Sequence, residues 1–284
     1  MAIRIITDSG SDITQDTADR WGIRVLPLSV RFGEEEYLDD VTLTSDDMYA
    51  RMIDTGEIPK TSQISPGAYR EAFREAVNAG DEVICITISS GMSGCFQSAM
   101  IAAEEFGDKV SVIDSLNVCA SQYVYVRYAR GLVRHGKPKD EIVRRLMRMR
   151  KRLHVIALVD SLEYARKGGR VSGAAALAGN IIHIKPIITS GREGKVEVLG
   201  TARGMNGAYK LFSKLIDKAG GIDSRFPVCL SYSGLSDAGM REYMEKSAEM
   251  FSEFKDRIHF SRIGATVGTY SGPNAIAIGF FDAR

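Results

Sequence analysis

Residues 82–88 (Glu-Val-Ile-Cys-Ile-Thr-Ile) form a short and almost continuously apolar run. Such a run is typical of a central strand in a parallel sheet, where both faces are buried. A serine- and glycine-rich loop follows at residues 89–94, and then a helix-like stretch at residues 96–106. Strand, loop and helix in this order predict a sheet with helices packed on its faces.

The same alternation continues along the whole chain. In the first half it predicts strands at residues 3–6, 24–32 and 110–113, helices at 15–21, 118–135 and 140–152, and helix starts at Ser45 and Ser65-Pro66. The second half predicts helices at 162–166, 206–219 and 238–253, and strands at 155–159, 186–189, 195–201, 227–232, 258–263 and 275–281. We therefore expect two α/β domains, at residues 1–155 and 156–284, with a ligand cleft between them.

Composition and charge narrow the class of protein. The 284 residues are 44% hydrophobic and 26% charged, as in an ordinary globular protein. With 37 Lys and Arg against 36 Asp and Glu, no overall field favours nucleic acid or an anionic membrane. No apolar run is long enough to span a membrane, and the first residues resemble a strand rather than a signal peptide. We expect a cytoplasmic protein without a nucleic-acid partner or stable membrane insertion.

The cysteines and acidic residues give no pattern of a metal site. Cys85, Cys95, Cys119 and Cys229 lie far apart, and neither a C-x-x-C pair nor a histidine at metal spacing occurs, so we expect buried, reduced thiols. Asp8 and Asp12, near the end of the first strand, are more typical of turn and helix caps than of metal ligands. We expect neither a metal nor a cofactor.

The loop Ser89-Ser90-Gly91-Met92-Ser93-Gly94 is the most informative polar segment. Ligands of α/β sheets gather where strands end, and the N-terminus of the following helix favours an anion. Ser93 is therefore a candidate donor to a carboxylate or phosphate. A serine here can equally be a helix cap, and the spacing alone does not separate the two interpretations.

Ser93 also suggests a second class of protein, a serine hydrolase that acts on acyl esters. The sequence Gly91-Met92-Ser93-Gly94-Cys95 resembles a nucleophile elbow but lacks its second glycine. None of the four histidines lies in a pattern that indicates a triad. The segment Lys167-Gly168-Gly169-Arg170 lacks P-loop spacing, so no motif indicates a nucleotide.

Two further segments each have an ordinary and a functional interpretation. The hydroxyl-rich residues 60–66 are either a capping loop or part of a binding site. The basic residues between 144 and 152 are either a solvated helix face or a docking patch for an acidic partner.

Short motifs occur in order along nearly the whole chain. They are Ile6-Thr7-Asp8-Ser9, Lys60-Thr61-Ser62-Gln63 with Ser65-Pro66, Ser89-Ser90-Gly91-Met92-Ser93-Gly94 with Gln97-Ser98-Ala99, Val112-Ile113-Asp114-Ser115, Leu162-Glu163-Tyr164, Lys167-Gly168-Gly169-Arg170-Val171-Ser172, Ile184-Lys185-Pro186-Ile187, Arg203-Gly204, Gly268-Thr269 and Gly272-Pro273. As an ordered set they resemble the DegV family of bacterial lipid-binding proteins, which includes the fatty-acid-carrying subunits of fatty acid kinase.

The resemblance implies two α/β domains that bury a long-chain fatty acid such as palmitate between them. By matching motifs, Thr61 and Ser93 are the ligands of its carboxylate, with Ser62 and the Gly94 N–H nearby and Arg203 in the supporting network. It also implies a non-catalytic chain whose partner, an ATP-dependent kinase subunit, forms acyl phosphate for phospholipid synthesis.

One motif departs from the family. The family usually has Gly-Thr-His-Thr-Gly-Pro-Gly where this chain has Gly268-Thr269-Tyr270-Ser271-Gly272-Pro273-Asn274, so Tyr270 replaces a histidine of the head-group network. Tyrosine donates a hydrogen bond but does not titrate near pH 7. The departure therefore bears on kinase coupling and leaves lipid binding intact.

The wall of the expected tunnel has one candidate segment. Residues 174–188 are rich in Ala, Leu and Ile. They form either the apolar tunnel wall or an ordinary core helix and strand.

Overall fold

The structure, a computed structural model, describes residues 2–171, 184–254 and 257–284. Its first sheet is parallel, in the order β2-β1-β6-β7, with bounds β1 (Ile3–Asp8), β2 (Arg24–Leu26), β6 (Glu82–Thr87) and β7 (Val110–Asp114). The predicted central strand is confirmed, because Val83, Ile84, Cys85 and Ile86 of β6 are fully buried. One face packs against α3 (Pro66–Asn78) and α4 (Cys95–Ala103), and the other packs against α5 (Cys119–Arg134).

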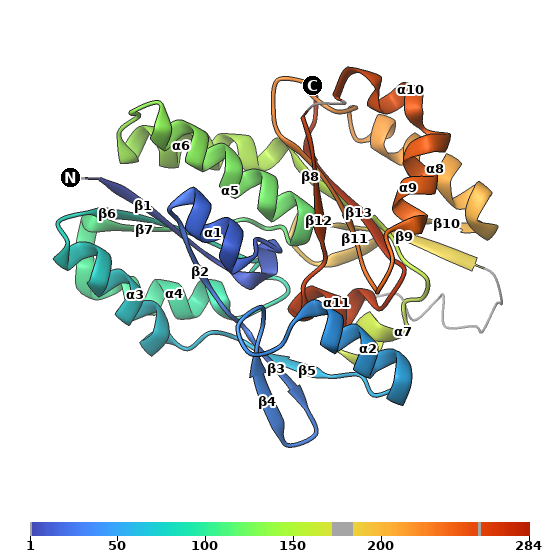
Figure 1. The fold of residues 1–284 in the computed structure, drawn as a ribbon. Helices are drawn as coiled ribbons and strands as arrows, with labels where there is room; N and C mark the ends of the chain where they lie inside the picture. The colour runs from blue at the N-terminus through green and yellow to red at the C-terminus, as the bar shows by residue number, and fades with distance from the viewer. Residues whose placement is uncertain (1, 172–183, 255–256) are drawn as a thin grey trace.

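The second sheet is mixed, in the order β10-β9-β8-β13-β11-β12. Its strands are β8 (Leu153–Leu158), β9 (Ile184–Ser190), β10 (Val196–Arg203), β11 (Val228–Tyr232), β12 (Ile258–Arg262) and β13 (Ile276–Phe281). Three helices pack on its outer face: α8 (Gly204–Lys218), α9 (Ala238–Lys246) and α10 (Ala248–Phe251). Figure 1 shows this second layer beside the first sheet. The predicted α/β class is confirmed. The division expected after residue 155 falls inside β8, whose first residue, Leu153, already pairs in the second sheet.

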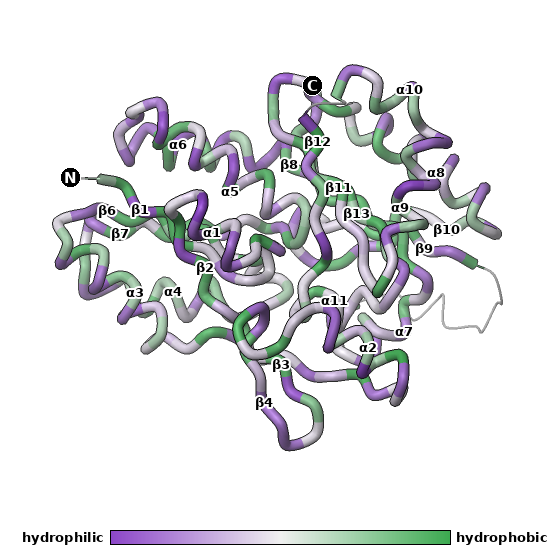
Figure 2. Tube along the Cα trace, viewed as in Figure 1, coloured by the Kyte–Doolittle hydropathy of each residue, from purple (hydrophilic) through white to green (hydrophobic). Residues whose placement is uncertain are grey.

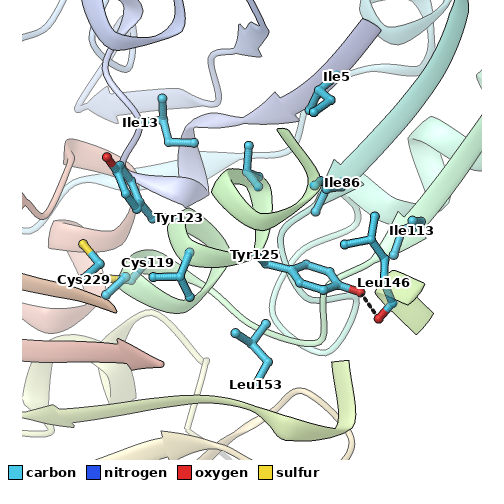
Figure 3. Packing of buried hydrophobic residues seen from close by; sticks show 14 of the residues in the cluster. Ile5, Ile13, Ile86, Ile113, Cys119, Tyr123, Tyr125, Leu146, Leu153 and Cys229 are labelled. Carbon is cyan, nitrogen blue, oxygen red and sulfur yellow. Dashed lines mark hydrogen bonds between the residues drawn. The ribbon is translucent and has the colours of Figure 1, made fainter. Parts of the chain in front are cut away.

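Helix α5 lies between the two sheets and joins them into one core. Its residues Tyr123 and Tyr125 are buried together with Ile5 and Ile113 of the first sheet and Cys229 of the second (Figure 3). The Tyr125 hydroxyl donates a hydrogen bond of 2.7 Å to the carbonyl of Leu146 in α6 (Lys139–Met149). Figure 2 shows the hydrophobic residues that follow β1, β6, β11 and β13 through this interior.

The α5 helix lies close against the second sheet at Gly279. A Cβ atom on this glycine would lie 2.2 Å from the backbone carbonyl carbon and oxygen of Ala120. Only a residue without a side chain permits that approach. Earlier in the chain, Ala277 of β13 and Ala275 just before it line a cavity instead.

A small third sheet corrects two predictions. The single strand predicted at residues 24–32 is wrong: β2 ends at Leu26, and β3 (Ser29–Phe32) pairs with β4 (Glu35–Leu38) and β5 (Lys60–Ser62). Pro27 separates β2 from β3, because proline has no N–H to donate to a strand ladder. The next residue, Leu28, donates its N–H to Ser9 Oγ at 3.0 Å. The predicted loop at 60–66 begins as the strand β5.

Several helix predictions are confirmed or adjusted. Helices α1 (Gln15–Trp21), α2 (Ser45–Thr55) and α7 (Glu163–Lys167) lie where expected. The long helix predicted at 238–253 breaks at Ser247, where φ is −118° and ψ is 26°. Helix α11 (Ala265–Ser271) was not predicted, since Gly268 and three β-branched residues weaken its helical pattern.

No helix in the described ranges is both long and apolar enough to cross a membrane. The four cysteines are buried and free, as predicted.

Candidate functional site

A cavity of about 390 Å³ lies where the first sheet, the second sheet and α11 meet. Its volume is within the range of roughly 300–1,000 Å³ that is usual for small-molecule sites. Both halves of the chain contribute lining residues, among them Leu28, Ile88 and Val118 from the first and Val155, Ile188 and Ala277 from the second.

The apolar wall of the cavity is the inner face of the second sheet. Ala157 of β8 lies directly opposite Ala277 of β13 on one side and Ile188 of β9 on the other. Successive residues of a strand point to opposite faces. The neighbours Ile156 and Ile278 therefore pack into the outer core with α8. Two alanines side by side leave space that larger residues would fill.

Two hydroxyl groups close one part of the cavity. The side chain of Thr61, on β5, and that of Tyr270, on α11, form a hydrogen bond of 2.6 Å between Oγ1 and OH. Both residues line the cavity, as do Ser62 and Gly94. The structure thus brings together five of the six residues named from the sequence, Ser93 included.

Ser93 lies directly before Gly94, the N-cap residue of α4. Its Oγ accepts a hydrogen bond of 3.3 Å from Cys95 N at the start of α4 and donates one of 3.2 Å to Cys95 Sγ. The same residue lines the cavity. Burial raises the pKa of the Cys95 thiol to about 11, so this thiol stays protonated at neutral pH.

Asp8 holds the start of the serine loop in place. Its carboxylate accepts hydrogen bonds from Ile88 N at 2.7 Å and from Gly10 N at 3.1 Å, and Gln122 Nε2 donates to it at 3.0 Å. Burial raises its pKa to about 6. The predicted capping role of Asp8 is confirmed. The described part of the chain contains no cluster of His, Cys, Asp and Glu that could hold a metal.

Gln63 reaches over the N-terminus of α4. A Cβ atom on Gly94 would lie 1.8 Å from Gln63 Oε1, so a glycine is required beneath this side chain. Gln63 Nε2 donates to Ser98 Oγ at 2.9 Å. The sequence contained Gln63 within a motif but gave no signal for this contact.

Arg170 is the guanidinium at the cavity, and Arg203 is not. Arg170 lines the cavity with its Cζ atom 5.0 Å from the centre of the Tyr270 ring, and it donates to Met92 O at 3.3 Å and Gly168 O at 2.7 Å. Within the described ranges it forms no ion pair. Arg203, expected in the head-group network, is exposed at the end of β10 and is not among the lining residues. In the sequence, Arg170 stood within a family motif and in a segment without P-loop spacing, and neither predicted that it lines the cavity.

Gly168 explains how Arg170 and Tyr270 come together. A Cβ atom at Gly168 would lie 2.3 Å from the Tyr270 ring, so the ring lies close against the backbone of this turn. The turn then carries Arg170 over the ring face, a favourable cation–π arrangement.

The expected tunnel wall is described only in part. Ile188 lines the cavity, while residues 174–183 lie outside the described residues.

The described residues give Ser93 no general base. His154 bonds to Asp282 at 2.7 Å, His135 to the Gly131 carbonyl at 2.7 Å, and His259 stacks on Tyr123. None of these three lines the cavity. The fourth, His183, lies outside the described residues.

Half of the basic run between residues 144 and 152 makes contacts within the fold. Arg152 pairs with Asp223 and Asp282, Arg150 donates to Asp114 O, and Arg145 pairs with Glu141. Arg144 and Arg148 are exposed.

Comparison with known proteins agrees with this architecture. A sequence model of the family described as "Uncharacterised protein, DegV family" matches residues 2–283. A DegV domain-containing protein from Caldanaerobacter subterraneus is 32% identical over 285 residues, or 99% of each chain.

Two solved structures are similar over nearly their whole length. A fatty-acid-binding DegV family protein from Thermus thermophilus is 29% identical, with a TM-score of 0.87 over 99% of this chain and 100% of that one. A stearic-acid-binding protein from Eubacterium ventriosum is 27% identical, with a TM-score of 0.85 over 98% of this chain and 97% of that one. The resemblance seen in the sequence is confirmed, and the two α/β layers with a cavity between them are those of a protein that belongs to the DegV family.

Proposed function

We propose that this chain is a non-enzymatic carrier that binds one long-chain fatty acid in the cavity and holds its carboxylate near Thr61 and Ser93. The observation that carries the proposal is the cavity itself, which has apolar walls from both sheets and hydroxyl groups with a guanidinium at one part. The Thermus and Eubacterium proteins, described as fatty-acid and stearic-acid binding, support the ligand class.

The apolar wall supplies the affinity for the acyl chain. Each methylene removed from water contributes about 0.8 kcal/mol, so a tail of about 14 methylenes contributes roughly 11 kcal/mol before other terms. The loss of translational and rotational freedom and the ordering of the tail offset much of that.

The carboxylate needs donors, because a buried charge without partners is strongly unfavourable. We assign direct donation to the hydroxyls of Thr61 and Ser93, with Ser62, the Gly94 N–H and Tyr270 nearby. The positive charge comes from Arg170 rather than Arg203, since Arg170 lines the cavity and Arg203 is exposed outside it. The N-terminus of α4, at Ser93 and Gly94, adds a favourable dipole.

The partner that we propose is an ATP-dependent kinase subunit, which would act on the presented carboxylate for phospholipid synthesis. The chain itself shows no nucleotide motif, so the phosphoryl chemistry belongs to that partner. Four buried, free thiols suit a cytoplasmic carrier.

Calorimetric titration with palmitate tests the assignment of the head group. Ser93→Ala and Thr61→Ala should each weaken binding by about 1–3 kcal/mol, which is roughly a 5- to 150-fold rise in Kd. Ser65→Ala is the matched control, because Ser65 also caps a helix, accepting from Ala68 N at 3.2 Å, but does not line the cavity.

Unchanged palmitate affinity in both site variants would contradict the assignment. Covalent labelling of Ser93 by a fluorophosphonate, with turnover of acyl esters, would favour the hydrolase instead.

A further inference from the structure

The N-terminus of α11 is held by two buried aspartates from the first half of the chain. The N–H groups of Ala265 and Thr266 donate to the two carboxylate oxygens of Asp39, each at 3.0 Å. Gly264 N donates to Asp12 Oδ1 at 2.9 Å. The side chains are almost inaccessible, with Asp39 1% and Asp12 6% exposed.

No ion pair compensates the Asp39 carboxylate among the residues that the structure describes. The guanidinium of Arg262 pairs with Asp46 at 2.7 Å instead. A buried carboxylate held only by neutral donors is costly, so its position is set by those donors. Asp39 therefore fixes the place of the first two N–H groups of α11.

The rest of α11 is also fixed against the first half of the chain. A Cβ atom at Gly268 would lie 2.3 Å from the Tyr49 hydroxyl and 2.7 Å from Met48 Cε, so the helix lies close against α2. Tyr49 donates to Ile263 O at 3.0 Å. At the other end, the Tyr270 hydroxyl meets Thr61.

We propose that Asp39 is a positioning residue for the head-group site: by holding the first turn of α11, it sets the Tyr270 hydroxyl against Thr61. This inference rests on the proposed function, in which the Thr61 hydroxyl binds the ligand carboxylate. The Thr61–Tyr270 hydrogen bond orients that hydroxyl, and a shift of α11 would misdirect it. Asp39 acts through the helix and does not itself line the cavity.

A double-mutant cycle with palmitate tests this coupling. Asp39→Asn keeps the shape of the side chain but places an NH₂ group against a backbone N–H, so we expect about a tenfold loss of affinity. Tyr270→Phe should cause a similar loss. If Asp39 acts through Tyr270, the double variant should bind no more weakly than Tyr270→Phe alone.

Control variants distinguish a positioning role of Asp39 from a general loss of folding. Asp47→Asn, at the exposed start of α2, should leave palmitate affinity unchanged. Asp39→Ser keeps one acceptor for the N-terminus of α11 and should fold even where Asp39→Asn does not. Its loss of palmitate affinity should lie between that of wild type and that of Asp39→Asn. Hydrogen exchange of the α11 amides, measured without ligand, should rise in the Asp39 variants and not in Asp47→Asn.

The outcomes are distinct. Additive losses in the double variant, or an unchanged affinity and unchanged exchange in folded Asp39→Asn and Asp39→Ser, would overturn the proposal. If the wild-type protein fails to bind palmitate, the proposed function is wrong. The exchange measurement then still decides whether Asp39 holds α11.

Discussion

The two faces of the second sheet differ in the size of their side chains, although they share the same strands. On the outer face, Ile156 and Ile278 are buried against α8 and α9. One residue along each strand, Ala157 and Ala277 face inward and line the cavity. The outer face supplies stability through close packing, whereas the inner face leaves room for a ligand. A one-residue alternation thus divides the two tasks within a single strand.

The largest expected effect comes from removing a large side chain from the outer face of the second sheet. Ile278 is fully buried, so Ile278→Ala should lower the free energy of unfolding by about 2–5 kcal/mol. Urea denaturation measures this change. Palmitate affinity of the folded variant should remain within about twofold of wild type, because the side chain points away from the cavity. A loss of affinity with little loss of stability would reverse the assignment of the faces.

The next prediction concerns the positive charge of Arg170 at the cavity. Arg170→Gln removes the guanidinium that lies over Tyr270 and should weaken palmitate binding by about 1.5–3 kcal/mol. Palmityl alcohol, which has no charge, should bind equally well to the variant and the wild type. Arg203→Gln is the matched control, since Arg203 is exposed outside the cavity lining. An equal effect of both substitutions would argue against Arg170 as the cation of the site.

A larger side chain on the inner face of the second sheet should change palmitate affinity more than it changes the free energy of unfolding, the reverse of Ile278→Ala. Ala277→Ile places a larger side chain in the cavity and should weaken palmitate binding by about 1–3 kcal/mol. Its free energy of unfolding in the absence of ligand should change less than that of Ile278→Ala. Shorter fatty acids should be affected less, and an equal loss for all chain lengths would place Ala277 away from the tail.

The last prediction concerns a buried carboxyl group in the first half of the chain. Burial raises the pKa of Asp12 to about 8 from an ordinary 3.8. The folded carboxyl keeps its proton at neutral pH while the unfolded one loses it, so this group stabilises the fold fully below pH 4 and less as pH rises toward 8. Each pH unit between the two pKa values corresponds to about 1.4 kcal/mol, and Asn cannot ionise, so Asp12→Asn should remove roughly 3–4 kcal/mol of the stability loss between pH 5 and pH 8. Parallel curves of Tm against pH for variant and wild type would contradict this.

The sequence predicted those parts of the fold whose signals are local. The apolar run at β6, the start of α2 at Ser45 and the Ser65 cap of α3 are signals within the local sequence, although the cap of α2 is Thr44 rather than the predicted Ser45 cluster. The strand predicted at 24–32 was wrong because one proline, Pro27, transfers the chain to another sheet. Helix α11 was missed because its stabilising partner, Asp39, lies more than 200 residues away.

At the candidate site, too, the sequence did not predict contacts between distant segments. Thr61, Ser93 and Tyr270 could be named only through family motifs, and their meeting depends on how distant segments pack. The motif that contains Arg170 did not predict its place at the cavity, because that place depends on the glycine turn against Tyr270. The motif that named Arg203 did not reveal its exposure at the end of β10.

The central claim is that the cavity between the sheets holds a fatty acid. Native mass spectrometry of the protein, purified without refolding, together with analysis of its extracted lipids, tests it most directly. We expect about one fatty acid per chain, and its identity would give the tail length that the cavity accepts. A protein that is empty, and that takes up neither added palmitate nor added oleate, would contradict the account.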